Sequence, residues 1–320
     1  MTALNTLKKA PALKPQSRIA LCSPAGVVGE RRLAEGVAWL ASQGYCPLPM
    51  PHAADDCGYL AGTDADRASD FMTALLDPTV DAILFTKGGY GCAKLLPLLD
   101  WQALAAIETP KLLMGFSDIT VLLTAFYHRL GWVGVYSPML ASNLIVSDQH
   151  WTREQWQRTT TATVLDLPFS VANLATYEPL YPEAGDVIVE APLYVANLTL
   201  LASLCGTPWQ SRTDGHLLVL EDWKESDYSL DRQFNQLKQA GLFDNLAGLL
   251  LADWAYTQRQ CELPLPQLLA SFVADKAIPA VGFGWMCGHG EQTTTLPIGT
   301  QARWDVATGQ LTLVEPWFCD

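Results

Sequence analysis

Residues 82–91 read Ala-Ile-Leu-Phe-Thr-Lys-Gly-Gly-Tyr-Gly, an apolar run that ends in a glycine-rich turn. Apolar residues in an unbroken row, rather than in alternation with polar ones, are typical of a strand buried on both faces. Residues 112–115 (Leu-Leu-Met-Gly) repeat this pattern, residues 18–23 precede it, and helical periodicity fills the intervals at 31–43 and 67–76. Buried strands that alternate with amphipathic helices predict a parallel sheet covered on both faces.

A further helix at 119–130 completes the predicted N-terminal domain, an α/β domain with a parallel, flavodoxin-like sheet over residues 1–165. The pattern loosens over residues 166–190, where prolines and polar residues indicate a linker. Residues 191–320 then combine helices with short strands, which predicts a second, mixed α/β domain that contains antiparallel strands. The helices are expected at 195–204 and 229–239, and the strands at 216–220, 246–252, 280–283, 294–296 and 310–314.

The chain has 320 residues, of which 20 are Lys or Arg and 33 are Asp or Glu, so its formal net charge is −13. An acidic surface repels phosphodiesters, and no run of basic residues offsets it, which argues against a nucleic-acid partner. No stretch approaches the roughly 20 apolar residues of a membrane span. Prolines interrupt the short apolar stretch after Lys8 and Lys9, so it lacks the core of a secretory signal. We therefore expect a soluble, cytoplasmic protein without a membrane partner.

The eight cysteines are scattered, without a C-x-x-C pair or the spacing of a zinc site. Most of them lie in apolar runs, which indicates reduced thiols in the core. Four of the five histidines have no special context: His52, His128, His150 and His216. We therefore expect neither a metal nor another cofactor.

Residues 115–120 (Gly-Phe-Ser-Asp-Ile-Thr) lie where a predicted strand turns directly into a helix. A hydroxyl at such a turn projects from the end of the sheet, and the helix N-terminus supplies N–H groups for a developing oxyanion. Ser117 is therefore a candidate nucleophile. Ser117 and Asp118 are equally suited to cap the helix. The hydrolase pattern G-x-S-x-G is also not met, because Ile119 replaces its final glycine.

The glycine-rich turn at 87–91 follows its strand at the edge where open α/β sheets bind their ligands. Glycines there let a ligand approach the backbone, whose N–H groups can then donate hydrogen bonds. A tight turn alone accounts for one glycine more readily than for three. The dinucleotide pattern G-x-G-x-x-G is not met, since residues 92–94 are Cys-Ala-Lys.

Glu221 begins a carboxylate cluster directly after the predicted strand 216–220, and His289 is flanked by glycines on both sides. A buried glutamate at a strand end can orient a histidine, although acidic residues there are more often solvated or capping. Small neighbours leave an imidazole accessible, as a general base requires, although a loop histidine commonly just faces solvent. Together with Ser117, these residues supply the types needed for a nucleophile, a base and its orienting partner.

These motifs together resemble the LD-carboxypeptidase family of serine peptidases. The resemblance extends from residue 23 to residue 299 and rests on segments 88–91, 115–120, 197–198, 206–208, 220–222, 288–290 and 295–299. Members of that family remove the terminal D-alanine from cytoplasmic murein tetrapeptides during peptidoglycan recycling, by cleaving an L,D bond without a metal. The resemblance implies that Ser117 is the nucleophile, His289 the general base and Glu221 its partner. It also implies that the serine lies on the N-terminal domain and the other two residues on the C-terminal domain.

The same resemblance suggests how a murein peptide substrate would be held in a cleft between the domains. The backbone N–H groups of Asp118 and Gly89 are the expected donors to the oxyanion. A carboxypeptidase must also bind a terminal carboxylate, for which Lys87 and Arg232 are candidates, although both suit ordinary surface ion pairs. Tyr90 is a further candidate for substrate binding. A homodimer follows from the resemblance alone.

Two departures from the family pattern bear on the substrate. Lys87 stands where the family usually has arginine, so a point charge replaces a planar fork. Val195-Ala196 stands where the family tends to have two glycines, which adds two β-carbons near a segment expected to approach a ligand or partner. Trp223 and Tyr228 are candidates for lining the cleft, although aromatic residues after a strand are as often part of a core.

Two other functions remain open. A microcin-immunity peptidase, a relative within the same resemblance, cleaves an aminoacyl-nucleotide conjugate. That activity favours an aromatic platform for a base, and no separate insertion supplies one. A non-catalytic protein that binds an anion in the turn at 87–91 is the alternative from another class.

Overall fold

The computed structural model describes residues 6–146, 149–171, 177–181, 187–252 and 265–319. The chain divides into two compact units. Unit 1 comprises Met1–Thr163 together with Trp317–Asp320, and unit 2 comprises Val164–Pro316. The last residues thus return to unit 1, where the Cys319 N–H donates to Ala10 O at 3.0 Å. Of the eight cysteines, Cys261 lies outside the described residues.

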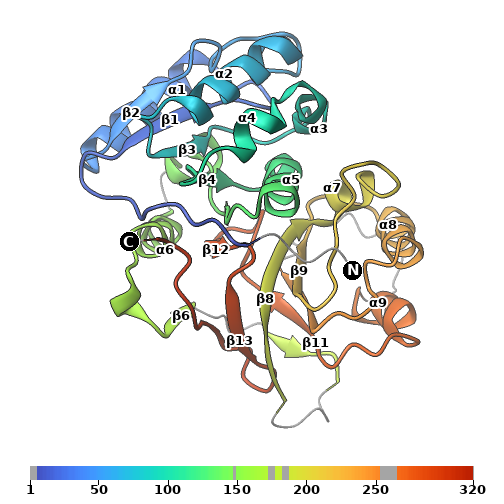
Figure 1. Cartoon of the computed structure of the whole chain (residues 1–320). Helices are drawn as coiled ribbons and strands as arrows, with labels where there is room; N and C mark the ends of the chain where they lie inside the picture. Colours follow the sequence, from blue (N-terminus) through green and yellow to red (C-terminus); the bar gives the residue numbers. More distant parts are fainter. Residues whose placement is uncertain (1–5, 147–148, 172–176, 182–186, 253–264, 320) are drawn as a thin grey trace. The chain divides into compact units, whose positions relative to one another are not determined.

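Unit 1 is built on a parallel sheet, as the sequence predicts. Its strands are β1 (Arg18–Cys22), β2 (Cys46–Pro49), β3 (Ala82–Phe85), β4 (Leu112–Gly115) and β5 (Val135–Tyr136). They are arranged in the order β5-β4-β3-β1-β2, of which Figure 1 labels β1 to β4. Every residue of β3 and β4 is buried, which explains why their sequences are apolar without alternation.

Helices connect these strands. They are α1 (Glu30–Ser42), α2 (Asp64–Leu76), α3 (Cys92–Leu95), α4 (Trp101–Ala105), α5 (Thr120–Leu130) and α6 (His150–Thr160), with the short turns η1 (Leu96–Leu98), η2 (Ser117–Ile119) and η3 (Leu140–Leu144). A capping box of Thr63 and Asp66 begins α2, and Gly131, with a φ of 70°, ends α5. Because the strands are parallel, the segments that follow β1, β2, β3 and β4 come together at one edge of the sheet. Hydrogen bonds join two of them, since the Gly26 N–H donates to Gly88 O at 3.1 Å.

Unit 2 contains a mixed sheet, which confirms the second fold prediction. Its strands are β6 (Phe169–Val171), β7 (Glu178–Pro179), β8 (Ile188–Asn197), β9 (Leu217–Glu221), β10 (Gly248–Ala252), β11 (Val281–Trp285), β13 (Gln301–Asp305) and β14 (Leu311–Leu313). The short strand β12 (Leu296–Pro297) is not part of this sheet. The sheet order is β6-β14-β13-β8-β9-β10-β11-β7. Strands β8 to β11 are parallel, and the outer strands pair antiparallel.

The helices of unit 2 are α7 (Leu198–Ser203), α8 (Asp227–Gln239), α9 (Leu265–Val273) and the short turn η4 (Val164–Asp166). Figure 1 shows α7, α8 and α9 beside one another along one side of the parallel strands. Helix α8 buries Leu230, Phe234 and Leu237, which lie on one face of the helix. Loops, rather than helices, directly follow the ends of β9 and β11.

The predicted helix at 195–204 is wrong in its first part, because residues 195–197 continue β8. Val195 pairs with Val219 and Ala196 with Leu220 of β9, and neither side chain is exposed. The two β-carbons that replace the family's glycines are therefore accommodated inside the sheet. The helix begins only after Asn197, whose side chain accepts a hydrogen bond from the Leu200 N–H at 3.1 Å.

The range 166–190, which the sequence suggests as a linker, contributes β6, β7 and the start of β8 to the sheet of unit 2. Two parts of this range, 172–176 and 182–186, lie outside the described residues. No helix in the part of the chain that the structure describes is both long enough and apolar enough to cross a membrane.

Candidate active site

Ser117 lies where the sequence analysis places it, at the end of β4 and the start of η2. Its φ is 62°, in the left-handed region that residues other than glycine seldom adopt. Backbone strain of this kind is typical of a nucleophile held on a sharp turn between a strand and a helix. The Ser117 N–H donates to the hydroxyl of Tyr136 at 3.3 Å. Tyr136 is the last residue of β5, the strand that pairs with β4.

The glycine-rich turn packs directly against this serine. A β-carbon at Gly88 would lie 3.0 Å from Cβ and 3.1 Å from Oγ of Ser117, so a side chain at this position would crowd the serine. Gly89 and Gly91 have φ values of 123° and 134°, which disfavour any side chain. The structure therefore explains all three glycines of the turn. Gly88 is explained by its contact with Ser117, and Gly89 and Gly91 by their backbone angles.

Asp118 connects the candidate nucleophile to the end of the glycine-rich turn through its side chain. Its buried carboxylate accepts a hydrogen bond from the Cys92 N–H at 2.8 Å, at the first residue of α3. Burial raises the pKa of Asp118, and the hydrogen bonds with Cys92 oppose that increase. The side chain thus fixes the turn beside Ser117, a role that the sequence analysis did not assign to it.

Lys87 and Tyr90 both lie on the exposed side of the same turn. The Lys87 ammonium donates to Val27 O at 3.2 Å. The ring of Tyr90 is 52% exposed, and its centroid lies 6.1 Å from that of Tyr59. The candidate nucleophile, the turn and these two candidate substrate residues therefore belong to one edge of unit 1.

Glu221 and His289 come together in unit 2, at the ends of β9 and β11. The two residues lie 68 positions apart, and the His289 imidazole donates through Nδ1 to Glu221 Oε2 at 2.6 Å. The glutamate side chain is fully buried, and the histidine side chain is 16% exposed. A histidine held in this tautomer carries its basic lone pair on Nε2, the nitrogen that must accept a proton from a nucleophile.

Trp223 covers the imidazole. Its ring is parallel to that of His289 within 1°, and the two ring centroids lie 5.4 Å apart. The Lys224 ammonium lies 4.2 Å from the centroid of the tryptophan ring. The tryptophan side chain remains 42% exposed. Parallel stacking restricts rotation of the imidazole, so Trp223 helps to fix the direction of Nε2.

Asn197 is a member of this group that the sequence analysis does not predict as a site residue. Its amide donates to Glu221 Oε1 at 3.0 Å and to Asp222 Oδ1 at 3.2 Å. The second oxygen of Asp222 accepts from the N–H and the hydroxyl of Thr199 at 2.9 and 2.8 Å. One amide at the end of β8 thus holds two neighbouring buried carboxylates in place. The sequence signal was the pair Asn197-Leu198, which the resemblance includes without a role.

The two carboxylates shift the titration of the group. Burial, followed by the charge of Glu221, raises the pKa of Asp222 to about 6. Burial alone would lower the pKa of His289, but the charge and hydrogen bond of Glu221, with the charge of Asp222, outweigh burial and raise the pKa. Glu221 therefore stabilises the imidazolium that forms when His289 accepts a proton.

The described contacts of Arg232 are with residues of α8 and not with Glu221 or His289. It lies on α8, where its guanidinium donates to Ser229 Oγ at 3.2 Å and approaches the Tyr228 ring. It lines a cavity of about 430 Å³ with Cys205 and Gln210 and with residues further along α8. Neither Glu221 nor His289 lines that cavity, so Arg232 has less structural support as a substrate residue than Lys87.

Gly288 is required by the contact between Glu221 and His289. Its φ is 104°, and a β-carbon at this position would overlap Glu221 Oε2. We expect Gly288→Ala to displace the carboxylate or the imidazole and to lower turnover by about 100-fold, the usual cost of a displacement near 1 Å. Steady-state kinetics with circular dichroism as the folding check measure this effect.

Gly206→Ala is the matched control, because Gly206 has a φ of 80° but no atom within 4 Å of the added carbon. This variant places a side chain on a left-handed backbone, as Gly288→Ala does, but its β-carbon overlaps no other atom. Equal losses of turnover in both variants would contradict the assignment of the effect to Glu221.

Two family models match this chain. The model described as the LD-carboxypeptidase N-terminal domain matches residues 19–137, and the LD-carboxypeptidase C-terminal domain matches residues 190–304. The murein tetrapeptide carboxypeptidase of Pseudomonas aeruginosa is 33% identical over 288 residues, which is 89% of this chain and 92% of that protein.

Solved structures agree with these matches. A muramoyltetrapeptide carboxypeptidase from Oxalobacter formigenes has a TM-score of 0.79 and 28% identity, and covers 93% of this chain and 99% of its own. MccF in complex with glutamyl sulfamoyl guanosine has a TM-score of 0.85 over 97% of this chain and 99% of its own, but at 24% identity it is similar in fold alone. With both domain models in sequence order and a relative that is one-third identical over most of its length, the chain belongs to the LD-carboxypeptidase family.

Proposed function

We propose that this protein is a serine carboxypeptidase that removes the terminal D-alanine from murein tetrapeptides. Ser117 attacks the carbonyl of the L,D bond while His289 Nε2 accepts the proton of its hydroxyl. The tetrahedral intermediate collapses to an acyl-enzyme, and His289 returns the proton to the nitrogen of the departing D-alanine. Water then attacks the ester with His289 again as the base, which releases the tripeptide and restores Ser117.

The observation that carries this proposal is the buried Glu221 carboxylate, which accepts a hydrogen bond from His289 at 2.6 Å. A carboxylate without solvent is costly unless it is paired, and here its partner is an imidazole that retains access to solvent. The left-handed backbone of Ser117 supports the other half of the mechanism. Both halves lie on motifs that the family models cover.

The remaining roles follow from the chemistry of the intermediate and the substrate. The backbone N–H groups of Asp118 and Gly89 are the proposed donors to the oxyanion, each worth about 10²–10³ in rate. Lys87 is the preferred partner for the terminal carboxylate, because it belongs to the same turn as Gly89. Tyr90 would contact the peptide beside it, and Arg232 is retained as a second candidate cation.

The cellular setting is part of the same proposal. Murein tetrapeptides that return to the cytoplasm during peptidoglycan recycling are the proposed substrate, and a homodimer is the proposed assembly. The relative from Pseudomonas aeruginosa, whose name states the tetrapeptide activity, supports the choice of substrate.

Digestion of murein tripeptide, tetrapeptide and pentapeptide in parallel, read by mass spectrometry, tests the substrate. We expect loss of one D-alanine from the tetrapeptide and no change in the other two. Loss of D-alanine from the pentapeptide, or an intact tetrapeptide after prolonged incubation, would contradict the proposal.

A microcin-immunity type of peptidase is the second candidate. The exposed, stacked ring of Trp223 is the observation that favours it, since a nucleobase can stack on such a surface. An aminoacyl sulfamoyl adenosine added as a fourth substrate separates the two activities. Binding of the peptides without any cleavage would instead favour a non-catalytic anion-binding protein.

The dependence of kcat/KM on pH follows from the raised pKa of His289. The imidazole must be neutral to accept the proton of Ser117, so protonation removes activity as the pH falls. Because Glu221 raises the pKa of His289 above the ordinary value of 6.5, the acid limb should have its midpoint above 6.5. A pH profile of tetrapeptide hydrolysis measures this, and a midpoint below 6.5 would separate the acid limb from this histidine.

A further inference from the structure

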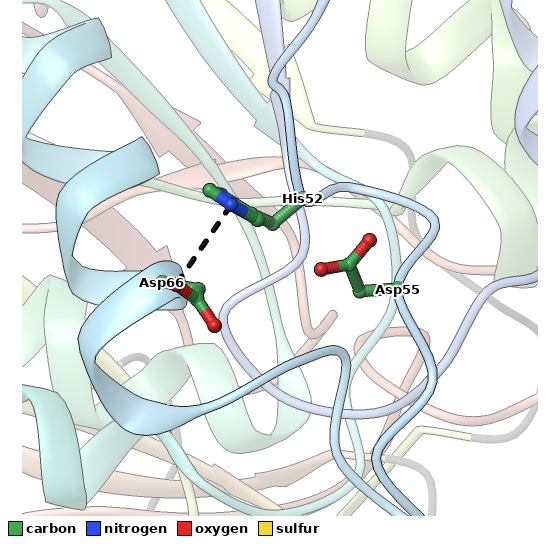
Figure 2. A group of neighbouring side chains, drawn as sticks. All are labelled: His52, Asp55 and Asp66. Atoms are coloured by element: carbon green, nitrogen blue, oxygen red, sulfur yellow. Dashed lines mark ion pairs between the residues drawn. The ribbon is translucent and has the colours of Figure 1, made fainter.

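His52, Asp55 and Asp66 come together at one end of the sheet of unit 1. Figure 2 shows the side chain of His52 near two carboxylates, that of Asp55 on its own loop and that of Asp66 on the first turn of α2. One possible donor atom from each residue lies within 4.8 Å of the other two. The His52 Nε2 atom lies 3.8 Å from Asp66 Oδ1. None of these residues is assigned to the proposed catalysis.

Asp70 fixes the direction of the imidazole from behind. Its carboxylate is buried and accepts hydrogen bonds from His52 Nδ1 and from the His52 N–H, both at 2.8 Å. The proton therefore resides on Nδ1, and Nε2, whose lone pair stays free to bind an ion, lies 3.8 Å from Asp66 Oδ1. A buried carboxylate behind a histidine is the outer partner that metal-binding histidines usually have.

Asp66 is held in the same manner. Its Oδ2 atom accepts hydrogen bonds from the N–H and the hydroxyl of Thr63 at 3.3 and 2.6 Å, within the capping box of α2. Its other oxygen, Oδ1, is the one that faces His52. The carboxylate of Asp55 packs beside Gly62, where an added β-carbon would lie 3.5 Å from Asp55 Oδ2 and 3.7 Å from Asp66 Cβ. Two of the three donors are thus oriented before any ion binds.

No lysine or arginine among the described residues offsets the charge of this group. Asp64, on the same turn of α2, is paired with Arg67 and with Lys94, the latter at 3.3 Å. Among the residues that the structure describes, neither Asp55 nor Asp66 has an ion pair with a lysine or an arginine. With His52 neutral, the three donors carry a charge of −2, which matches one divalent cation.

The geometry points to a binding site for a divalent transition-metal ion of the zinc type, formed by His52 Nε2, Asp66 Oδ1 and one oxygen of Asp55. An imidazole nitrogen favours zinc over magnesium or calcium, which prefer oxygen alone. Bonds of about 2.0–2.1 Å in a tetrahedron place donor atoms about 3.4 Å apart. The observed 3.8 Å between His52 Nε2 and Asp66 Oδ1 is therefore close to what the ion requires. The site is partly exposed, so water would complete the coordination of a bound ion.

Such an ion would connect the loop after β2 to the start of α2. The Ala61 N–H in this loop donates to Ala25 O at 3.0 Å, and the adjoining Gly26 N–H donates to Gly88 O. The ion would thus stabilise the base of the segment that supports the glycine-rich turn. Its role is structural, and it takes no part in the proposed cleavage.

Titration of the full-length apoprotein with Zn²⁺, and with Co²⁺ as a spectroscopic probe, tests the site. We expect one equivalent of Zn²⁺ to bind. Bound Co²⁺ should show the visible bands of nitrogen and oxygen ligands without a thiolate charge-transfer band. The thiol of Cys57 is exposed in the same loop, so a thiolate band, or loss of binding in Cys57→Ser, would overturn the assignment.

Asp55→Asn and His52→Gln are each expected to weaken Zn²⁺ binding by at least about tenfold, because even outer partners of metal ligands contribute about 10–100-fold. Asp56→Asn is the matched control, since it removes one negative charge from the next residue along the loop and should leave the affinity unchanged. Circular dichroism of each variant checks folding. Affinity that is equal in all three variants, or no binding to the unmodified protein at millimolar Zn²⁺, would overturn the site.

Discussion

Replacing Ser117 by alanine is expected to lower D-alanine release from murein tetrapeptide by about 10⁴–10⁶-fold, the usual cost of removing a nucleophile from a triad. The structure gives no reason for a loss of folding, since alanine removes only the hydroxyl and keeps the β-carbon beside Gly88. Binding of the peptide should therefore persist, and it can be measured by calorimetry with the inactive variant.

Ser42→Ala is a suitable control, because Ser42 is an exposed residue at the end of α1 whose hydroxyl donates to Trp39 O and accepts from the adjacent Gln43 side chain. It should retain full activity. Unchanged turnover in Ser117→Ala would remove Ser117 from the mechanism and would favour a non-catalytic role for the glycine-rich turn.

Replacing Glu221 by glutamine is expected to lower kcat by about 10³–10⁴-fold with little change in the binding of the peptide. The amide keeps the shape of the side chain but cannot stabilise an imidazolium, and it can hold His289 in the wrong tautomer. Loss of the negative charge also removes the main cause of the raised pKa of His289, so the acid limb of the pH profile should move to lower pH.

Glu291→Gln provides the matched control for that variant. Glu291 lies two residues after His289 on the exposed side of the loop, so its neutralisation removes a nearby charge without touching the imidazole. Its rate and pH profile should resemble those of the unmodified protein. An equal shift of the acid limb in both variants would show that any nearby negative charge raises the pKa of His289, and that the hydrogen bond to Glu221 is not the cause.

The architecture of unit 1 could be predicted because its physical causes are local. Strands such as 82–85 are buried on both faces and are apolar throughout, and the glycines that follow them reflect a turn with unusual backbone angles. The end of β8 was harder to predict. Residues 195–204 join a buried strand end to a helix, and the combined apolar pattern has helical spacing. Only Asn197, a favoured N-cap residue, indicates where the helix begins.

The contacts within the site depend on the order of strands, which a single sequence does not reveal. Glu221 is the last residue of β9 and His289 follows β11, with β10 between the two strands in the sheet. The motifs identified both residues, but not the 2.6 Å contact or the role of Asn197. The group of His52, Asp55 and Asp66 was missed for the same reason. Its members have no metal-binding spacing in the sequence, and the end of β2 and the start of α2 bring them together.

We propose that Ser117 of unit 1 and His289 of unit 2 act on one bond as a single catalytic unit. A double-mutant cycle of Ser117→Ala and His289→Gln, read as kcat for D-alanine release from murein tetrapeptide, tests it most directly. Groups that act as a unit lose activity once, so the double variant should be no slower than the slower single variant, within about threefold. If the two losses multiply in the double variant, the serine and the histidine act independently and the proposed mechanism is wrong.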